Sequence, residues 1–311
     1  MKKNPLATFK PISDEERAAF LSKLKPGVTR TPYTAFLEKI ITQGEWVANE
    51  RTGKKCLTII NHDFTYDVCN NVLPLDTTRT SYVRKAIMEL VGYIRGFVSA
   101  KQFRDIGVDT WDENTNESEG WLNNPFRTGP DDMGGAYGEQ LRAWKDHKGE
   151  PIDQLRKVYE KLCKGIDDRG LILLFLNPGI EEKTCLRPCL FFHQFSILGG
   201  KLYLNSVQRS CDGPLGLNFN QVQCFFLLAA MSKITGIPAG EAYHKVINGH
   251  IYEDQIDTVL QQLNNEPYSS PSLELSDEFD SLEYLDEVFS ANDFKVSGYQ
   301  SHGKIAHQFA K

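Results

Sequence analysis

The chain lacks the features that mark secreted, metal-binding and membrane-spanning proteins. Its seven cysteines are odd in number and include no Cys-x-x-Cys pair, a pattern that fits neither a disulfide framework nor a zinc site. No run offers the roughly 18 apolar residues that a membrane span needs. The chain begins with Met-Lys-Lys but no apolar segment follows, so we expect no signal peptide. A reducing cytoplasm, that of a host cell if the source is viral, is the expected location.

Strong positive charge is also absent. The 311 residues carry a formal net charge of −6, which argues against a general nucleic-acid surface, so we expect no DNA partner. Hydrophobic residues make up 41% of the chain, enough for a large core. No internal repeat or linker divides it. The sequence predicts an N-terminal extension over residues 1–30 and a single domain over residues 31–311.

The hydrophobic periodicity alternates between helical and strand-like segments. We predict helices over residues 14–24, 34–43, 80–96, 152–166, 220–235, 255–264 and 281–289, and strands over 56–61, 63–68, 171–177, 190–198 and 201–208. Residues 112–136 are rich in Asn, Asp, Gly and Pro, which is typical of a loop. Strands and helices in irregular order indicate an α+β fold.

The most informative stretch is residues 186–212. Cys189 follows Pro188 and opens an apolar strand, which turns at Gly199-Gly200 and returns to Gln208-Arg209-Ser210-Cys211-Asp212. A lone cysteine is usually a buried structural residue, but this hairpin brings a thiol and an arginine to neighbouring strands. Positive charge favours the thiolate, which is the reactive form, and the same arginine can hold a phosphate. One site could therefore bind a nucleotide and attack it.

Three arginines lie in turns or at strand ends, namely Arg51, Arg169 and Arg209. A surface arginine is usually only solvated. With Ser210, the three could instead form a cage of fork-shaped donors around a phosphate.

Four further residues have both a structural and a functional interpretation. Asn220 begins a predicted helix and would be a common N-cap, or its amide could read the O4 and N3–H edge of uracil. Glu89, on an apolar helix, is costly to bury unless it is paired or catalytic. His250 and Tyr252 alternate along a strand and so point to one side, either as core residues or toward a ribose hydroxyl.

Together these residues and their neighbours resemble the thymidylate synthase family. The resemblance covers roughly residues 34–311 and includes Arg187-Pro188-Cys189 and the run from Gln208 to Asp212. The matching segments, in chain order, are residues 50–53, 73–79, 89–90, 110–112, 136–138, 168–169, 187–189, 208–212, 215–220, 250–252 and 298–299. One such segment is weak evidence, whereas this many in order at compatible spacing is strong.

The resemblance implies a three-layer α+β fold with a central mixed sheet, through which two subunits form a homodimer. It implies transfer of a one-carbon unit to C5 of dUMP, with 5,10-methylenetetrahydrofolate as co-substrate and no metal. Cys189 would attack C6 of the uracil, and the other catalytic residues would be Glu89, Tyr137 and Asp212. Substrate-binding residues would be Arg51, Arg209, Ser210, Gln208, Asn220, His250 and Tyr252, with Arg169 serving the other subunit's site. Folate-binding residues would be Arg79, Trp111, Leu186, Asp212, Gly216, Phe219, Tyr299 and Lys311.

The chain departs from the family pattern at several positions. Gly170 stands where many members have a second arginine, Leu190 where many have histidine, and Gly213 where a bulkier residue is usual. A loop insertion is expected at about residues 115–134. The chain ends in Gln-Phe-Ala-Lys, whereas family members usually end in a short apolar segment that closes over the folate.

This C-terminal sequence is compatible with two reactions. If hydride reaches the exocyclic methylene in a dry site, the product is dTMP, and thymidylate synthesis is our first prediction. A looser lid would admit water and give 5-hydroxymethyl-dUMP, the product of a dUMP hydroxymethylase. Trp111 should shield the methylene and favours the synthase. A non-enzymatic nucleotide- or RNA-binding relative is a third alternative, which the joint presence of Cys189, Glu89, Tyr137 and Asn220 argues against.

Overall fold

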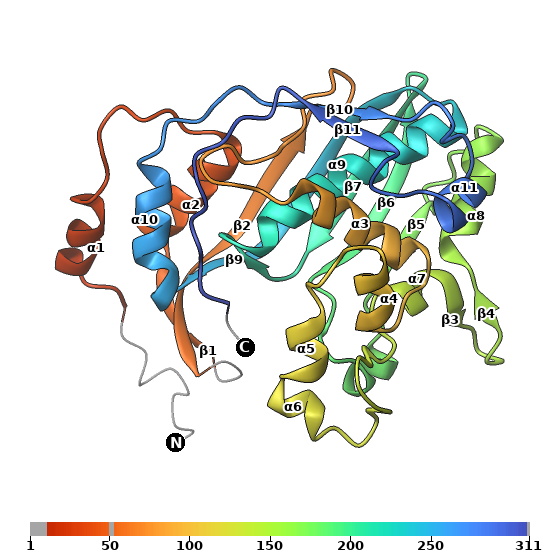
Figure 1. Ribbon diagram of the computed structural model, residues 1–311, viewed down its shortest axis with the longest axis horizontal. Helices are drawn as coiled ribbons and strands as arrows, with labels where there is room; N and C mark the ends of the chain where they lie inside the picture. The colour runs from red at the N-terminus through yellow and green to blue at the C-terminus, as the bar shows by residue number, and fades with distance from the viewer. Residues whose placement is uncertain (1–10, 50–52, 310–311) are drawn as a thin grey trace.

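The computed structural model describes residues 11–49 and 53–309, and a mixed sheet dominates it (Figure 1). Within these residues the sheet order is β1-β2-β9-β7-β6-β5, with β8 beside β9. Strands β7 and β8 run parallel to β9, and the other pairs are antiparallel. The predicted α+β class with a mixed sheet is confirmed. The strand bounds are β1 Glu45–Asn49, β2 Lys54–Tyr66, β5 Ile172–Leu174, β6 Leu190–Leu198, β7 Lys201–Gln208, β8 Cys211–Asp212 and β9 Ala239–Tyr252.

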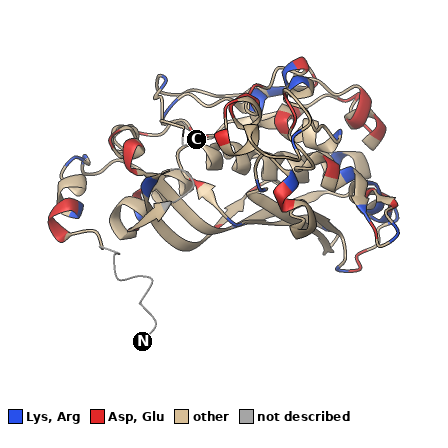
Figure 2. Cartoon of the chain, turned by 90° about the horizontal axis from the view of Figure 1, so that it is seen from below, with Lys and Arg blue, Asp and Glu red and all other residues tan. Residues whose placement is uncertain are grey.

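The helices cover one face of the sheet in two further layers. α9 (Gly216–Thr235) packs on β7 and β9, and α3 (Val83–Ile94) packs on α9. α2 (Pro32–Gln43) packs on β2 and β9. The short helices around α3 are α4 Ala100–Asp105, α7 Gly138–Ala143 and α11 Leu282–Glu287. Figure 2 shows the strands along one side of the molecule and the helices on the other.

The remaining elements lie around these layers. They are α1 Asp14–Leu21, α5 Asp112–Asn116, α6 Glu119–Leu122, β3 Trp144–Lys145, β4 Pro151–Ile152, α8 Gln154–Cys163, η1 Pro178–Lys183, η2 Glu253–Gln255, α10 Ile256–Leu263, β10 Ser272–Leu275 and β11 Phe294–Ser297. Within the described ranges, no helix is both long and apolar enough to cross a bilayer.

The predicted hairpin of residues 190–208 is confirmed to the residue. Gly199 and Gly200 join β6 to β7 with φ angles of 58° and 76°, which side chains rarely tolerate and which suit a tight hairpin turn. The two strands predicted over 56–61 and 63–68 are instead one strand, β2. A φ of 66° at Asn61 marks the predicted break, but pairing with β9 continues on both sides of it. The predicted loop of residues 112–136 contains α5 and α6.

β9 is 14 residues long, yet the sequence predicted only its end at residues 250–252. Two glycines, which are uncommon in strands, hide the pattern. A side chain at Gly240 would meet the Tyr203 ring at 2.5 Å, and one at Gly249 would meet the Phe36 ring at 2.4 Å. The glycines therefore let aromatic rings lie directly on the backbone of the strand.

The strand directions bring distant parts of the chain to one end of the sheet. β7 and β9 are parallel and both end there, whereas β6 runs the other way and begins there. Cys189 precedes β6, Arg209 follows β7, and Tyr252 closes β9. A bulge at Phe191, between the pairs Leu190–Gln208 and Phe192–Val207, distorts this end of β6. Such bulges redirect neighbouring side chains.

Candidate active site

The sulfur of Cys189 lies beside a fixed guanidinium group. Nη2 of Arg209 is 3.7 Å from Sγ of Cys189, and the same group donates to the carbonyls of Pro188 and Arg187 at 2.9 and 2.8 Å. The Arg209 backbone N–H donates to the Cys189 carbonyl. The guanidinium is therefore held by the loop that carries the thiol, and its charge stabilises a thiolate. The contact predicted from the hairpin is present.

Tyr137 braces the same loop from the other side. Its hydroxyl oxygen accepts the backbone N–H of Cys189 at 2.8 Å. Its ring stacks on Tyr93 with centroids 4.5 Å apart and meets Trp111 edge-on at 5.6 Å. Burial raises the pKa of the Tyr137 hydroxyl well above its ordinary value, so the phenol keeps its proton at neutral pH and can donate it to a bound group.

Glu89 is buried on α3 and is paired. The Thr110 hydroxyl donates to Oε1, and the Gln223 amide donates to Oε2 at 2.8 Å. Burial raises the pKa of the Glu89 carboxyl, and these hydrogen bonds oppose the rise. A buried carboxyl poised in this way suits proton transfer.

Asn220 lies inside α9 rather than at its start. The helix begins at Gly216, and Asp212 accepts the backbone N–H of Leu215 just before it. The N-cap interpretation of Asn220 is therefore wrong. The Asn220 amide accepts from Gln208 Nε2 at 2.9 Å and donates to Gln223 Oε1 at 2.9 Å. Sequence reasoning missed Gln223, whose only signal is a polar side chain one turn beyond Asn220 on an apolar helix.

Asp212 lies on β8 opposite His250 in the parallel pair with β9. Its carboxylate accepts from Gln255 Nε2 at 3.0 Å, and burial raises its pKa to about 6. His250 and Tyr252 face the same side, as predicted, with ring centroids 5.2 Å apart. Nδ1 of His250 lies 3.0 Å from the Asn248 side-chain oxygen. A carboxylate and two polar rings thus meet at the end of β9.

The residues predicted to bind folate surround this end of the sheet. Arg79 is buried and donates to the Pro214 carbonyl at 2.5 Å, and the Tyr299 hydroxyl accepts from the Ser81 N–H at 2.8 Å. Leu186 lines a groove of about 1050 Å³ that reaches Arg209. An added Cβ at Gly216 would make only ordinary van der Waals contacts, at 3.7 Å with the Asn220 side chain and 4.0 Å with that of Asp212. Phe219 is partly buried against the core.

The last described residues also reach Asp212. The His307 ring lies between Thr258 Oγ1 at 2.8 Å and Gln262 Oε1 at 2.9 Å. The carbonyl of Gln308 then accepts from Gln255 Nε2 at 2.8 Å, and the same nitrogen donates to Asp212. One amide thus joins the C-terminal segment to the carboxylate.

Comparison with known proteins identifies the family. A family model described as thymidylate synthase matches residues 31–311. The chain belongs to the thymidylate synthase family. It is 56% identical over 279 residues to a protein of Histophilus somni strain 2336 and to one of Idiomarina loihiensis, and 55% identical to one of Haemophilus influenzae strain PittGG. All three are named thymidylate synthase, and each match covers 89% of this chain and 99% of the relative.

Two departures from the thymidylate synthase pattern have a structural reason. At Gly213 an added Cβ would lie 2.9 Å from the Leu37 side chain, so α2 occupies the space that a bulkier residue would need. Leu190 is buried and pairs with Gln208 across β6 and β7. It therefore fills the inner face of the sheet with an apolar group.

Arg169, one of the predicted site residues, lies apart from this cluster. Arg169 is exposed in the loop before β5, where its φ is 58° and its carbonyl accepts from the Gln194 amide at 3.0 Å. Arg51 and Lys311 lie outside the described residues.

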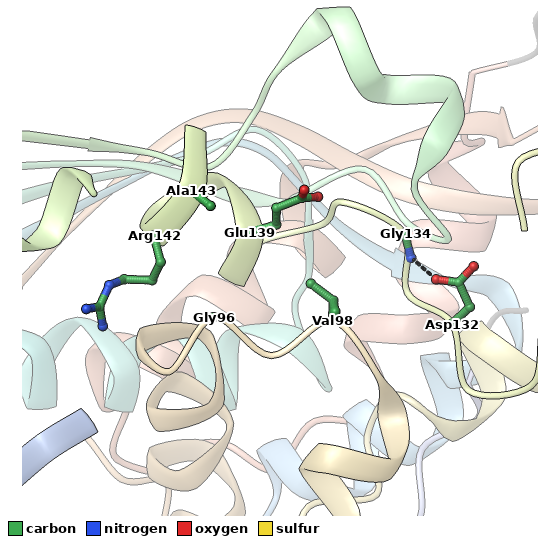
Figure 3. Close-up of a pocket in the computed structure, with 7 residues that line it drawn as sticks. All are labelled: Gly96, Val98, Asp132, Gly134, Glu139, Arg142 and Ala143. Atoms are coloured by element: carbon green, nitrogen blue, oxygen red, sulfur yellow. Dashed lines mark hydrogen bonds between the residues drawn. The ribbon is translucent and has the colours of Figure 1, made fainter. Parts of the chain in front are cut away.

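A second pocket of about 420 Å³ lies away from the predicted site residues (Figure 3). Its lining includes Asp132, which accepts the backbone N–H of Gly134, and Glu139. Arg142 forms ion pairs with Asp153 and Asp286 at 2.9 and 2.6 Å. These pairs tie α7 to α8 and α11, and no residue predicted for the site lines this pocket. Among the described residues, no group of three or more His, Cys, Asp and Glu side chains could hold a metal ion.

Proposed function

We propose that the chain is a thymidylate synthase, a methyltransferase that converts dUMP to dTMP with 5,10-methylenetetrahydrofolate as co-substrate. The observation that best supports this function is the position of the Arg209 guanidinium, 3.7 Å from the Cys189 sulfur. The Asn220 amide, which matches uracil, and the buried Glu89 carboxyl belong to the same site. The relatives that bear the same name over nearly the whole chain support this function, and they do not favour the hydroxymethylase alternative.

The chemistry begins at Cys189. The thiolate adds to C6 of the uracil ring, and the electron pair of the C5–C6 bond moves toward C5 and O4. C5 then bonds to the one-carbon unit. Removal of the C5 proton lets the bond between the one-carbon unit and the folate nitrogen break, which leaves an exocyclic methylene on C5. Addition of hydride to the methylene and expulsion of the Cys189 thiolate then restore the C5–C6 double bond. Tyr137, whose hydroxyl contacts the loop that carries Cys189, assists the removal of the C5 proton, while Glu89 organises proton transfer through water.

The folate supplies the carbon and the hydride when bound, and the residues present fit it. A buried carboxylate accepts hydrogen bonds from pterin N–H groups, which suits Asp212. The groove beside Leu186 and Arg209 has room for an extended ligand. Trp111, edge-on to Tyr137, excludes water from the reacting carbon. The Gln308 carbonyl, held through Gln255 to Asp212, places the C-terminal segment over this side.

The nucleotide is held mainly by residues at the ends of β7 and β9 and on α9. Arg209 and Ser210 bind the phosphate, together with Arg51 and with Arg169 of the partner subunit. Gln208 orients the Asn220 amide, which reads the uracil. His250 and Tyr252 hold the deoxyribose hydroxyl.

Product analysis tests this function directly. The protein is incubated with dUMP and 5,10-methylenetetrahydrofolate, the nucleotide is identified by mass, and dihydrofolate is followed by its absorbance. We expect dTMP and an equal amount of dihydrofolate. A product one oxygen heavier than dTMP, with no dihydrofolate, would establish hydroxymethylation instead, and no reaction would refute both.

We also propose that two subunits pair through the face of the sheet that helices leave uncovered (Figure 2). Ile60 is 67% exposed there and Ile247 is 40% exposed, and the Tyr203 and Tyr243 rings stack at 6.5 Å. Gln194, on an outward-facing position of β6, holds the loop of Arg169. Pairing would cover the apolar side chains and carry that arginine toward the partner's phosphate.

Subunit mixing tests the dimer and the role of Arg169 together. Arg169→Ala and Cys189→Ser proteins should each be nearly inactive as homodimers. If Arg169 serves the partner's site, a mixed dimer contains one site with both residues intact, so unfolding and refolding the two together should restore about a quarter of parental activity. No restoration would place Arg169 in its own subunit's site or in none.

A further inference from the structure

Gln223 joins the two residues that handle the base and the proton. Its side chain is 2% exposed on α9. Nε2 donates to Glu89 Oε2 at 2.8 Å and to the Ala86 carbonyl at 3.2 Å. Oε1 accepts from Asn220 Nδ2 at 2.9 Å. A single amide therefore connects the predicted uracil reader to the predicted proton-transfer carboxylate.

The Glu89 carboxylate, together with the carbonyls of Ala86 and Ser210, sets the direction of the hydrogen bonds in this network. An ionised carboxylate only accepts, so Gln223 must turn Nε2 toward Glu89 and Oε1 toward Asn220. Asn220 must then present Nδ2 to Gln223 and Oδ1 to Gln208, whose Nε2 donates to it at 2.9 Å. The nitrogen and oxygen of an amide are nearly equal in size, so packing alone does not choose between the two orientations.

The orientation of the Asn220 amide decides which pyrimidine it matches. Uracil presents an N3–H donor beside an O4 acceptor, whereas cytosine presents an N3 acceptor beside an amino donor. An amide free to turn over by half a rotation would satisfy either ring. An amide fixed in one orientation satisfies only one of them and leaves the other with unpaired buried groups, which is costly.

We propose that Gln223 is a positioning residue that fixes the Asn220 amide through Glu89 and thereby makes the site select uracil over cytosine. The proposal rests on the function above, in which Asn220 reads the base. It adds a coupling between the ionisation of Glu89 and the choice of base, because one network of hydrogen bonds links the two.

The ionisable groups that face Glu89 are phenols, so Glu89 is the group whose charge changes as the pH falls, and burial raises its pKa. Tyr93, on the same helix, and Tyr137, from the turn before α7, face it, and burial raises the pKa of both hydroxyls well above their ordinary value. Cys189 and Arg209 act on Tyr137 rather than on Glu89 directly. A protonated Glu89 can itself donate, so it no longer requires Nε2 of Gln223 to face it, and the Ala86 carbonyl alone then favours that orientation. Base selection should therefore weaken as the pH falls through the pKa of Glu89.

The first test is Gln223→Met, which keeps the volume and removes both hydrogen bonds. Dissociation constants for dUMP and dCMP are measured by equilibrium dialysis at pH 8, and tritium release from 5-tritiated dUMP is followed against pH. We expect the dCMP-to-dUMP ratio of dissociation constants to fall about tenfold. Loss of the donor raises the pKa of Glu89, so the acidic limb of the rate profile should move up by about one pH unit. A parental ratio in Gln223→Met would overturn the proposal.

Gln221→Met is the matched control. Gln221 is also 2% exposed on α9, but among the described residues its Nε2 has no hydrogen-bond partner. It lines a different cavity, beside Tyr33 and Asp76. This variant should keep both the parental ratio and the parental pH profile. If the ratio of dissociation constants and the pH profile changed equally in the two variants, the cause would be the loss of any buried polar group. That result would refute a positioning role for Gln223.

Two further measurements keep the test decisive if Gln223→Met folds poorly. Gln223→Glu retains an acceptor toward Asn220 but loses the donor toward Glu89, so it should keep the ratio while moving the acidic limb upward. In the unmodified protein the ratio itself should fall as the pH is lowered through that limb. A ratio that stays constant with pH contradicts the coupling. Absence of tritium release from the unmodified protein would instead refute the proposed function, so the two failures are distinguishable.

Discussion

The two halves of the site are formed by different kinds of structural element. The residues proposed to bind the nucleotide, here called the nucleotide half, lie at strand ends and on α9 and contact one another, as Arg209 does Cys189 and Gln208 does Asn220. The folate half stands on connecting segments and on the C-terminal residues, where one Gln255 nitrogen serves both Asp212 and Gln308. From this difference we expect the nucleotide half to be preformed and the folate half to open and close around the second substrate.

The comparison also separates what each half must do. The nucleotide half must hold a thiolate and a ring within bonding distance, which demands fixed geometry. The folate half must admit a large ligand and then exclude water, which demands a movable segment. Substitutions in the two halves should therefore change different kinetic constants.

The largest effect is expected from Cys189→Ser in the nucleotide half. A serine hydroxyl is a far weaker nucleophile than a thiolate, so tritium release from 5-tritiated dUMP should fall by about a thousandfold or more. Affinity for dUMP should change little, because the sulfur is not a binding group. Equal rates for the variant and the parent would exclude nucleophilic catalysis by this residue.

Arg209→Lys comes next. Lysine cannot donate to two backbone carbonyls and also lie beside the sulfur, so dUMP affinity should weaken by about 10- to 100-fold and the rate should fall with it. Arg187→Lys is the control, since that exposed side chain pairs with Glu181 instead. A similar loss in both variants would mean that general positive charge, and not the fixed fork, matters at this end of the sheet.

Gln255→Leu should affect the folate half more than the nucleotide half, where it removes only the acceptor of the Tyr252 backbone N–H. It releases both Asp212 and the Gln308 carbonyl, so the KM for the folate should rise about tenfold while the dissociation constant for dUMP stays near the parental value. The share of product that carries a hydroxyl should also increase, because the C-terminal segment is less firmly placed. A parallel loss of dUMP affinity would break the division into two halves.

The smallest effect concerns pH and Asp212. Burial raises the pKa of this carboxyl to about 6, so it is charged at pH 8 and becomes neutral as the pH falls through 6. The charged form accepts hydrogen bonds from the pterin more strongly, so the KM for the folate should rise about threefold between pH 8 and pH 5. In Asp212→Asn the KM should be higher at pH 8 and should not show this rise. A variant that retained the parental dependence would assign it to another group.

The sequence predicted the neighbours of Cys189 better than those of Asp212 for a physical reason. A hairpin fixes which residues are neighbours, so the register of β6 and β7 already brought Cys189 to Arg209. Helical spacing likewise buried Glu89 among apolar residues on α3. In both cases a local pattern determined the position of the functional group.

The groups that were missed depend on contacts between distant segments. Gln223 contacts Glu89 because α9 packs on α3. Gln255 contacts Asp212 because η2 comes directly after β9, and β9 pairs with β8. The N-cap interpretation of Asn220 failed because the helix begins four residues earlier, at Gly216. Arg169 does not reach the cluster of site residues in its own chain. Its proposed position depends on a dimer, which a single sequence does not describe.

The guanidinium beside Cys189 has a consequence for chemical labelling. Burial raises the pKa of the Cys185 and Cys224 thiols to about 12 and that of Cys211 well above its ordinary value, so these sulfurs stay protonated and shielded at neutral pH. An electrophilic probe at neutral pH should therefore reach the reactive sulfur well before them, and dUMP should protect it. Counting the sulfurs protected in this way would measure the concentration of working sites without any turnover.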